Sequence, residues 1–484
     1  MGILRINWFI HQMLTAHALD RTRLMALQQK RFRALLRHAV ANAPFYREKY
    51  RGLDLENCRL ADLPIVSKKE MVENFDDFVT DRRLKKAEIR CWLEDRSHLG
   101  RMYRGRFIVF HTSGTTGENA LVVYDRRGLD YVHAAVMARH TLPEEPSAWK
   151  RTMIFLELLL VQRQRIATVV MTGGPYPAYT AALYTPRLHH LFVTQKIFSL
   201  RDPLDKIVAD LNEFQPDAIV SYPSLLGVLA REQLAGRLRL HFDRFTSTVA
   251  GTSEPLSEKT KQLARAAWSR EVQDTYGTAE CFALARSCRR FKRMHVMEDL
   301  CIVEAVDRHG RPVPDGTPGD KILLTNLFNK VQPFIRYEVG DVTGFSTEIC
   351  DCGLPFRTLL PVEGRIDDVF YIDRPGGGYD AVHPYIFLGP IVELSEVREF
   401  QLAQTGRNEI TFFYAPTDCA ADLEPKVRRT LEEGLTRASL LGRVALRLQR
   451  VEEVDRDARS GKFRQIISRV GPPADLDDGV RMEH

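Results

Sequence analysis

The sequence predicts an α/β protein with a large N-terminal layered α/β domain, residues 1–365, and a smaller, mobile α+β C-terminal domain, residues 366–484. From residue 151 to residue 300, strand-like runs alternate with helical ones, which is the order of elements in layered α/β folds. Strand-like patterns dominate between residues 300 and 345. After Gly364, strand-like and helical patterns both occur and indicate a smaller α+β unit. A chain of 484 residues is also too long for one ordinary domain.

Helices are expected first along the chain. Between residues 14 and 50, apolar side chains recur at helical spacing, which predicts a pair of helices that ends near Ala43. The Arg and Lys side chains between them are interpreted as a solvated helix face. Residues 60–66 have the pattern of an extended segment, and Ser67 is a typical N-cap for another helix.

Three expected strands in the middle of the chain end in small or polar residues, which is where α/β sheets bind ligands. They are residues 168–171 before Thr172-Gly173-Gly174, residues 218–220 before Ser221-Tyr222, and residues 247–251 before a helix over 257–268. Further strands are expected at residues 301–306, 321–325, 333–337, 410–414 and 444–448, with a helix over 423–436.

Composition and charge narrow the class of protein. The 69 Lys and Arg residues exceed the 63 Asp and Glu residues by only six, which suits anionic substrates but makes no case for nucleic acid. The longest apolar run, residues 155–161, contains Glu157 and is too short to span a bilayer. The N-terminus has the features of neither a signal peptide nor a myristoylation site. We therefore expect a cytoplasmic protein without a membrane partner, in which the eight cysteines form no disulfide framework.

A loop rich in glycine and hydroxyl groups follows the expected strand at residues 107–110. Its glycines let the backbone approach a ligand closely, and its hydroxyl and N–H groups suit a polyphosphate. It is not the common phosphate loop, because Glu118 stands where that motif needs lysine. An ordinary hairpin turn has the same composition, so both interpretations stay open here. The residues of this loop are Thr112, Ser113, Gly114, Thr115, Thr116 and Gly117.

Four further segments combine residue types that carry chemistry. Residues 274–280 join an aromatic ring, a glycine, a hydroxyl and a carboxylate, and residues 336–341 place an aspartate after a glycine at a strand end. Residues 364–368 lie at the expected domain boundary, and Lys462 lies in a glycine-containing loop near the C-terminus. Each segment alone is typical of a turn or a surface loop.

Together, in order and spacing, these five segments resemble the adenylate-forming (acyl-CoA synthetase-like) superfamily, in its phenylacetate–CoA ligase and coenzyme F390 synthetase branch. The resemblance extends to the N-terminal part, in residues 35–39, 43–47 and 63–68, and so covers nearly the whole chain. It implies an ATP-dependent ligase that activates a carboxylic acid and transfers the acyl group to a thiol, expected to be that of CoA.

The resemblance also implies where ATP binds. Residues 113–117 would hold the β- and γ-phosphates, and Tyr276 with Gly277 would lie against the adenine. Thr278 would contact the α-phosphate, and Asp341 would accept hydrogen bonds from the ribose hydroxyls.

The remaining implied roles concern catalysis and domain movement. Glu280 would help to hold Mg²⁺, a hard cation that prefers carboxylate and phosphate oxygens. Arg365 would lie near the phosphate, and Asp367 would be the hinge of the C-terminal domain. Lys462 would bridge the carboxylate and the α-phosphate, where a cation aimed at the developing charge helps most. Because it lies on the mobile domain, this lysine can be withdrawn for the second step.

The acid would lie beside the phosphate loop, and an aromatic or medium-chain acid is expected. The candidate walls of its pocket are residues 222–224, residues 250–255 and Phe282.

Cysteine spacing gives one more prediction. Cys350-Asp351-Cys352-Gly353 resembles a Cys-Pro-Cys-Gly turn of this branch, and Cys288 and His295 follow the Tyr276 segment where some relatives keep a Cys and a His. Three thiolates and one imidazole form a closed structural zinc set. Buried free cysteines remain the alternative interpretation.

The chain departs from the resembled pattern after the hinge, where residues 371–384 contain three additional glycines. The acceptor therefore stays open between CoA, an acyl carrier protein and an amine, and a homodimer is likewise left open. A catalytically idle ligand-binding homologue is a further alternative, against which the retention of Glu280, Asp341 and Lys462 argues.

Overall fold

The structure is a computed structural model that describes residues 2–111, 120–141, 163–184, 193–243, 247–254, 258–288, 293–307, 309–362, 370–382, 396–416, 423–452 and 466–470, and the single residues 256, 290, 387, 391, 394 and 454. In these ranges no helix combines the length and the apolar character that crossing a bilayer requires.

The N-terminal helices form where capping residues and a proline predict them. Asp20 caps α2 through the Arg23 N–H, α2 ends at Asn42, and Pro44 opens α3. Ser67 caps α4 in a capping box with Glu70, each side chain accepting the other's backbone N–H. The expected helical pair and the Ser67 cap are thus confirmed. The bounds are α1 Gly2–His17, α2 Arg21–Asn42, α3 Pro44–Lys49, η1 Leu60–Asp62, α4 Lys68–Glu73, α5 Phe75–Phe78, α6 Lys86–Glu94 and η2 Arg96–His98.

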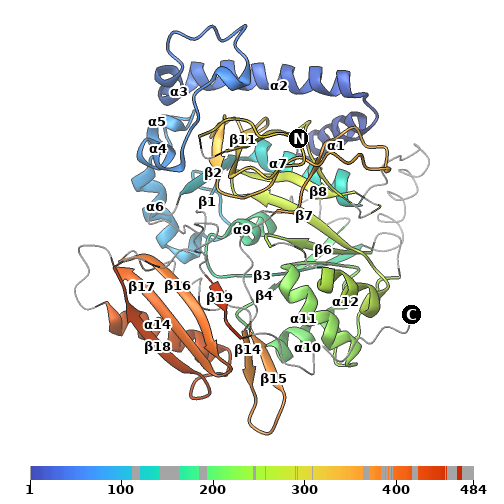
Figure 1. Ribbon diagram of the computed structural model, residues 1–484, viewed down its shortest axis with the longest axis vertical. Helices are drawn as coiled ribbons and strands as arrows, with labels where there is room; N and C mark the ends of the chain where they lie inside the picture. The colour runs from blue at the N-terminus through green and yellow to red at the C-terminus, as the bar shows by residue number, and fades with distance from the viewer. Residues whose placement is uncertain are drawn as a thin grey trace.

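An eight-stranded sheet organises the middle of the chain (Figure 1). Its order is β13-β9-β8-β7-β6-β5-β3-β4, and the five strands from β4 to β7 are parallel to one another. Apolar side chains of β3, β5 and β6 pack against α10, α11 and α12 in one buried cluster. This arrangement confirms the expected layered α/β class. The bounds are β3 Gln164–Val170, α9 Pro177–Leu183, β4 Val193–Ser199, α10 Leu204–Phe214, β5 Ala218–Ser221, α11 Pro223–Leu234, β6 Thr248–Thr252, α12 Glu258–Trp268, β7 Val272–Thr278, β8 Cys281–Ser287, β9 Met294–Val296 and β13 Thr358–Leu359.

A second, larger core joins the N-terminal helices to two small antiparallel sheets, β1–β2 and β10–β11–β12. Because β1 pairs with β2, the glycine- and hydroxyl-rich segment after His111 connects a hairpin, so a hairpin connection and a phosphate loop do not exclude one another here. The expected strand at 333–337 is wrong in its bounds: β12 begins at Tyr337, because Arg336 adopts a left-handed φ of +47°. The bounds are β1 Phe107–His111, β2 Leu121–Asp125, α7 Arg126–Val136, η3 Met137–Thr141, β10 Cys301–Val306, β11 Lys321–Asn326 and β12 Tyr337–Val339.

The described residues after position 369 build their own core from a hairpin, a four-stranded sheet of order β18-β17-β16-β19 and helix α14. In Figure 1 these elements are the orange and red ones at the lower left and bottom. The boundary expected near residue 365 lies outside the described residues, so the division into two domains stays a prediction. The bounds are β14 Phe370–Asp373, β15 Tyr379–Val382, β16 Val397–Gly406, β17 Glu409–Pro416, α14 Glu424–Arg437, β18 Ala445–Arg450 and β19 Ile466–Ser468.

Candidate functional site

A cavity of about 630 Å³ lies along β7 and against the residues that follow β12. Its wall contains five of the residues proposed from the sequence, namely Tyr276, Gly277, Thr278, Glu280 and Asp341. Three of these come from β7, one from the turn after it, and Asp341 from a strand end far along the chain. The fold thus gathers two separate sequence segments around one space.

Tyr276 and Asp341 are in direct contact. The Tyr276 hydroxyl donates a hydrogen bond to Asp341 Oδ2 at 2.7 Å, and both side chains are half-buried. This bond joins β7 to the end of β12 and fixes the ring beside the carboxylate. The residues proposed for adenine and ribose therefore lie side by side, as one nucleoside would need.

Gly277 has a steric role that the sequence did not indicate. A Cβ at this position would lie 2.5 Å from the carbonyl oxygen of Phe282, on the neighbouring strand β8. Any side chain would push β7 and β8 apart. Next to it, the Thr278 hydroxyl accepts the N–H of Cys281 at 3.2 Å, which closes the turn between the two strands.

Glu280 is the buried acid of the site, with 8% of its surface exposed. Burial raises the pKa of its carboxyl group; the hydroxyl of Thr278 and the charge of Lys68 oppose this rise, and the charge of Asp341 adds to it. Burial also raises the pKa of Tyr337, and Glu280 raises it further. Two neighbouring carboxylates in a buried wall are unfavourable unless a cation offsets their charge, so the position fits a hard divalent ion.

Lys68 lines the same cavity, although its sequence context indicated only the first turn of a surface helix. It arrives there because Val66 pairs with β12: the Val66 N–H donates to the Arg336 carbonyl at 3.0 Å, and the Glu338 N–H donates to the Val66 carbonyl at 2.9 Å. A contact between segments so far apart in sequence leaves no local signal.

Arg336, the first residue of the segment that ends at Asp341, holds this pairing in place. Its guanidinium binds both oxygens of Glu304, at 3.1 and 3.0 Å, and donates to the carbonyls of Ala61 and Leu63. Arg336 thus holds the backbone segment that leads to Lys68, and its own side chain does not line the cavity.

Asp274 is the second residue of the cavity wall that sequence reasoning missed. It lies two positions before Tyr276 on β7, so both side chains belong to the same face of the strand. Burial raises the pKa of Asp274 to about 6, and the charge of Lys261 lowers it in part. The only signal was its place at the start of the Tyr276 segment.

Several proposed residues lie outside the described residues, and their roles stay predictions. They are Thr112, Ser113, Gly114, Thr115, Thr116 and Gly117 of the phosphate loop, Arg365 and Asp367 of the boundary, and Lys462. The residue that precedes the loop, His111, is described, however. The His111 N–H donates to the Pro175 carbonyl at 3.3 Å, and Pro177 lines the cavity.

Of the residues predicted to form the wall of the acid pocket, some line the cavity and others pack in the hydrophobic core. Ser253 and Glu254 line the cavity. Tyr222 is buried against the helices of the central sheet, and Phe282 packs on Phe110 and Tyr124 with ring centroids 5.4 and 5.6 Å apart. These two residues are part of the hydrophobic core.

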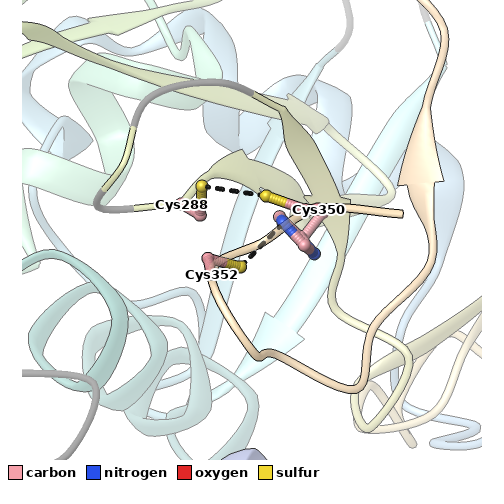
Figure 2. Close-up of side chains that lie close together, drawn as sticks. Cys288, Cys350 and Cys352 are labelled. Atoms are coloured by element: carbon pink, nitrogen blue, oxygen red, sulfur yellow. Dashed lines mark hydrogen bonds between the residues drawn. The ribbon is translucent and has the colours of Figure 1, made fainter. Parts of the chain in front are cut away.

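The proposed cysteine–histidine set converges in space (Figure 2). One ligand atom from each of Cys288, His295, Cys350 and Cys352 lies within 4.8 Å of all the others. The Sγ atoms of Cys288 and Cys350 are 3.7 Å apart, and Cys352 Sγ lies 3.4 Å from His295 Nε2. His295 Nδ1 lies 3.0 Å from the carbonyl oxygen of Phe356, which leaves Nε2 free to face the thiols.

These distances fit a tetrahedral zinc site. With Zn–S bonds of about 2.3 Å and Zn–N bonds of about 2.0 Å, the tetrahedral edges are about 3.8 Å between sulfurs and about 3.5 Å between sulfur and nitrogen. Burial raises the pKa of Cys352 to about 12 when no cation is present. The donor types and their spacing therefore match a closed structural zinc set.

Comparison with known proteins supports one family. No family model matches the chain. The chain is 25% identical over 361 residues to the phenylacetate–coenzyme A ligase of Thermus thermophilus, covering 73% of each protein. It is 24% identical over 364 residues to the phenylacetate–coenzyme A ligase of Aromatoleum evansii, covering 72% of each.

A solved structure gives the same fold. The crystal structure of 2-hydroxyisobutyryl-CoA ligase in complex with 2-HIB-AMP and CoA matches with a TM-score of 0.57 and 21% identity, covering 94% of this chain and 91% of that one. The fold, the ordered segments and the sequence relatives agree with the resemblance found in the sequence. The chain is thus similar in sequence to phenylacetate–coenzyme A ligases and in fold to an adenylate-forming CoA ligase.

Proposed function

We propose that this chain is an AMP-forming acid–thiol ligase that activates a carboxylic acid with ATP and transfers the acyl group to CoA. The observation that carries the proposal is the gathering of Tyr276, Thr278, Glu280 and Asp341 around one cavity. The named sequence relatives are phenylacetate–coenzyme A ligases, which supports an aromatic or medium-chain acid as substrate.

The cavity provides for a nucleotide laid along β7. Tyr276 offers a ring for the adenine, and Asp341 offers a carboxylate for the ribose hydroxyls. Asp274, on the same face of β7 as Tyr276, offers a buried acceptor for the amino group of adenine. Thr278 is four residue steps along the strand from Asp274, a length of about 13 Å, so base and α-phosphate have room at opposite ends.

In the first step an oxygen of the substrate carboxylate attacks the α-phosphorus of ATP, an acyl–adenylate forms and pyrophosphate leaves. The obstacle is the approach of two anions, which preorganised cations and hydrogen-bond donors overcome. Thr278 would donate to the α-phosphate, and Lys68 and Lys462 would offset the developing charge. A Mg²⁺ ion held by Glu280 would neutralise phosphate oxygens when bound.

In the second step the thiol attacks the acyl carbon and AMP leaves. The hairpin β14–β15 falls at the place where the chain departs from the family pattern. Its turn residues Gly376, Gly377 and Gly378 all have positive φ, and Arg374 and Arg443 both pair with Asp380, close to the turn. This difference supports a second candidate function, in which the acceptor is an acyl carrier protein or an amine.

We also propose that Cys288, His295, Cys350 and Cys352 hold a structural Zn²⁺. The ion would tie the end of β8 and strand β9 to the loop before β13. In the same sheet, β7, which carries the nucleotide residues, is next to β8 and two strands from β9. The cytoplasmic location and a homodimeric state remain part of the proposal.

Mass spectrometry of the reaction products tests the function. Protein, ATP, Mg²⁺, CoA and a panel of aromatic and aliphatic acids should give AMP and the acyl-CoA thioester in equal amounts. AMP without a thioester would favour the second candidate function. Absence of AMP with every acid, although the protein binds ATP, would contradict both.

A further inference from the structure

Arg201 lies at the carboxyl edge of the central sheet, outside the wall of the nucleotide cavity. It follows β4 by two residues, and its backbone N–H donates to the Ser199 hydroxyl at 3.1 Å. Its guanidinium covers Gly173, which follows β3 with a φ of +84°. A Cβ at Gly173 would lie 3.4 Å from Arg201 Cζ, so the glycine leaves room for the guanidinium against the backbone.

The guanidinium of Arg201 has no carboxylate partner in the part of the chain that the structure describes. Among the described residues, its one side-chain hydrogen bond is a long one, 3.5 Å from Nη2 to the hydroxyl of Tyr176, and its buried Nε has no acceptor there. By contrast, the buried guanidiniums of Arg139 and Arg336 each bind both oxygens of a carboxylate. A half-buried arginine keeps its charge, so this guanidinium would be stabilised by a bound anion.

Three hydroxyl groups belong to the same end of the sheet. The hydroxyls of Thr172 and Ser199 lie 2.6 Å apart at the ends of β3 and β4. The Tyr176 hydroxyl accepts the long hydrogen bond from Arg201 Nη2. A planar fork of N–H donors with neighbouring hydroxyls is the donor arrangement that phosphate oxygens prefer.

Tyr176 connects this position to the catalytic site. Its ring contacts the ring of His111 edge-on, with centroids 6.2 Å apart, and His111 directly precedes the phosphate loop. Along the sheet, β4 is four strands from β7, and at about 4.8 Å per strand these two strands are roughly 19 Å apart. A small carboxylic acid does not reach so far from the α-phosphate, whereas the long pantetheine arm separates a thiol from its phosphate by such a span.

We propose that Arg201, with the Tyr176 hydroxyl, binds a phosphate group of the phosphopantetheine-bearing acyl acceptor. The inference rests on the proposed function and adds to it the position at which the acceptor is recognised. The same chemistry serves free CoA and the phosphopantetheine arm of a carrier protein, because both carry a phosphate at the end of the pantetheine arm.

The test compares thiol acceptors that differ in their phosphates. The variants Arg201→Gln and Tyr176→Phe are assayed for thioester formation with CoA, dephospho-CoA, phosphopantetheine and pantetheine. Arg165→Gln is the matched control, because Arg165 is also half-buried but lies at the opposite end of β3, over the ring of Phe214. Circular dichroism and Tm establish that each variant is folded.

Loss of a charge-assisted bond should raise KM for CoA roughly 10- to 100-fold in Arg201→Gln, with KM for pantetheine and all values of the control unchanged. An equal effect on phosphopantetheine places the contact at the phosphate next to the arm. An effect on CoA alone places it at the nucleotide phosphates.

Two results would overturn the proposal. One is an equal change for CoA and pantetheine, or no change for either. The other is a selective loss of pyrophosphate exchange with dicarboxylic acids, which would assign Arg201 to the acid. If the unaltered protein forms no adenylate, the proposed function fails separately. Calorimetry then measures Kd for CoA and for pantetheine with the unaltered protein and with Arg201→Gln. A rise in Kd for CoA but not for pantetheine supports the inference, and equal changes overturn it.

Discussion

The hydroxyl of Tyr276 donates to Asp341 Oδ2 at 2.7 Å, across 65 positions of sequence. The two residues belong to separate segments, for which the family resemblance implies contacts with the adenine through the ring and with the ribose through the carboxylate. Their contact makes the wall of the cavity a single unit, because movement of β7 relative to the end of β12 would break the bond. The first prediction follows from this relationship.

Tyr276→Phe removes the hydroxyl and keeps the ring. A typical hydrogen bond contributes about 1 kcal/mol to stability, so the free energy of unfolding in urea should fall by about that amount. KM for ATP should rise by less than about tenfold, since the ring remains for the adenine, and Tyr276→Ala should raise it further. Equal KM values for ATP in both variants would argue against a role of the ring.

Gly277→Ala should destabilise the protein by about 1–3 kcal/mol, because its Cβ would meet the Phe282 carbonyl oxygen at 2.5 Å and force two strands apart. Gly340→Ala is the matched control, since a Cβ there has nothing within 4 Å. Chemical denaturation of both variants measures the difference. Equal stabilities would contradict the close approach of β7 and β8.

Asp274 predicts a pH dependence. Its pKa is about 6 in the folded protein, above the usual 3.8, because burial disfavours the charged form. The folded state therefore binds this proton more tightly than the unfolded state, and stability falls as pH rises from about 4 through 6. The loss is about 3 kcal/mol at neutral pH.

Asp274→Asn removes this titration. The variant should be more stable than the unaltered protein at pH 7 and equal to it at pH 4, which denaturation at both pH values measures. If the carboxylate also accepts the adenine amino group, the variant should bind ATP more weakly at pH 7. A difference in stability that does not change with pH would exclude the titration of Asp274 as its source.

The cysteine–histidine set predicts one zinc ion per chain. Cys352→Ser should lose the ion and lower Tm, and a chelator should lower Tm in the unaltered protein only. Cys91→Ser, which changes an exposed thiol on α6, is the control. Metal analysis by mass spectrometry checks the stoichiometry, and purified protein free of zinc would favour the alternative of free buried thiols.

Local signals in the sequence predicted much of the fold. Ser67 as an N-cap and the small residues after β3 and β5 were identifiable from a few neighbouring residues. The left-handed Arg336 was not, because its conformation is fixed by Glu304 and by backbone carbonyls distant in sequence.

The site was predicted less completely than the fold, for the same physical reason. Tyr276, Glu280 and Asp341 lie in segments with recognisable order and spacing. Lys68 enters the cavity only through the pairing of Val66 with β12, and Arg201 meets Tyr176 only through the order of strands in the sheet. Such contacts depend on tertiary packing and leave no pattern in neighbouring residues.

Acid-dependent exchange of pyrophosphate into ATP tests the central claim most directly, because only reversible adenylate formation produces it. The unaltered protein should exchange with at least one class of acid. Glu280→Gln and Lys462→Ala should each lower the rate at least about 100-fold. Glu88→Gln, on the surface of α6, should leave it unchanged. Exchange at the full rate in both active-site variants, or none with any acid in a protein that binds ATP, would contradict the account.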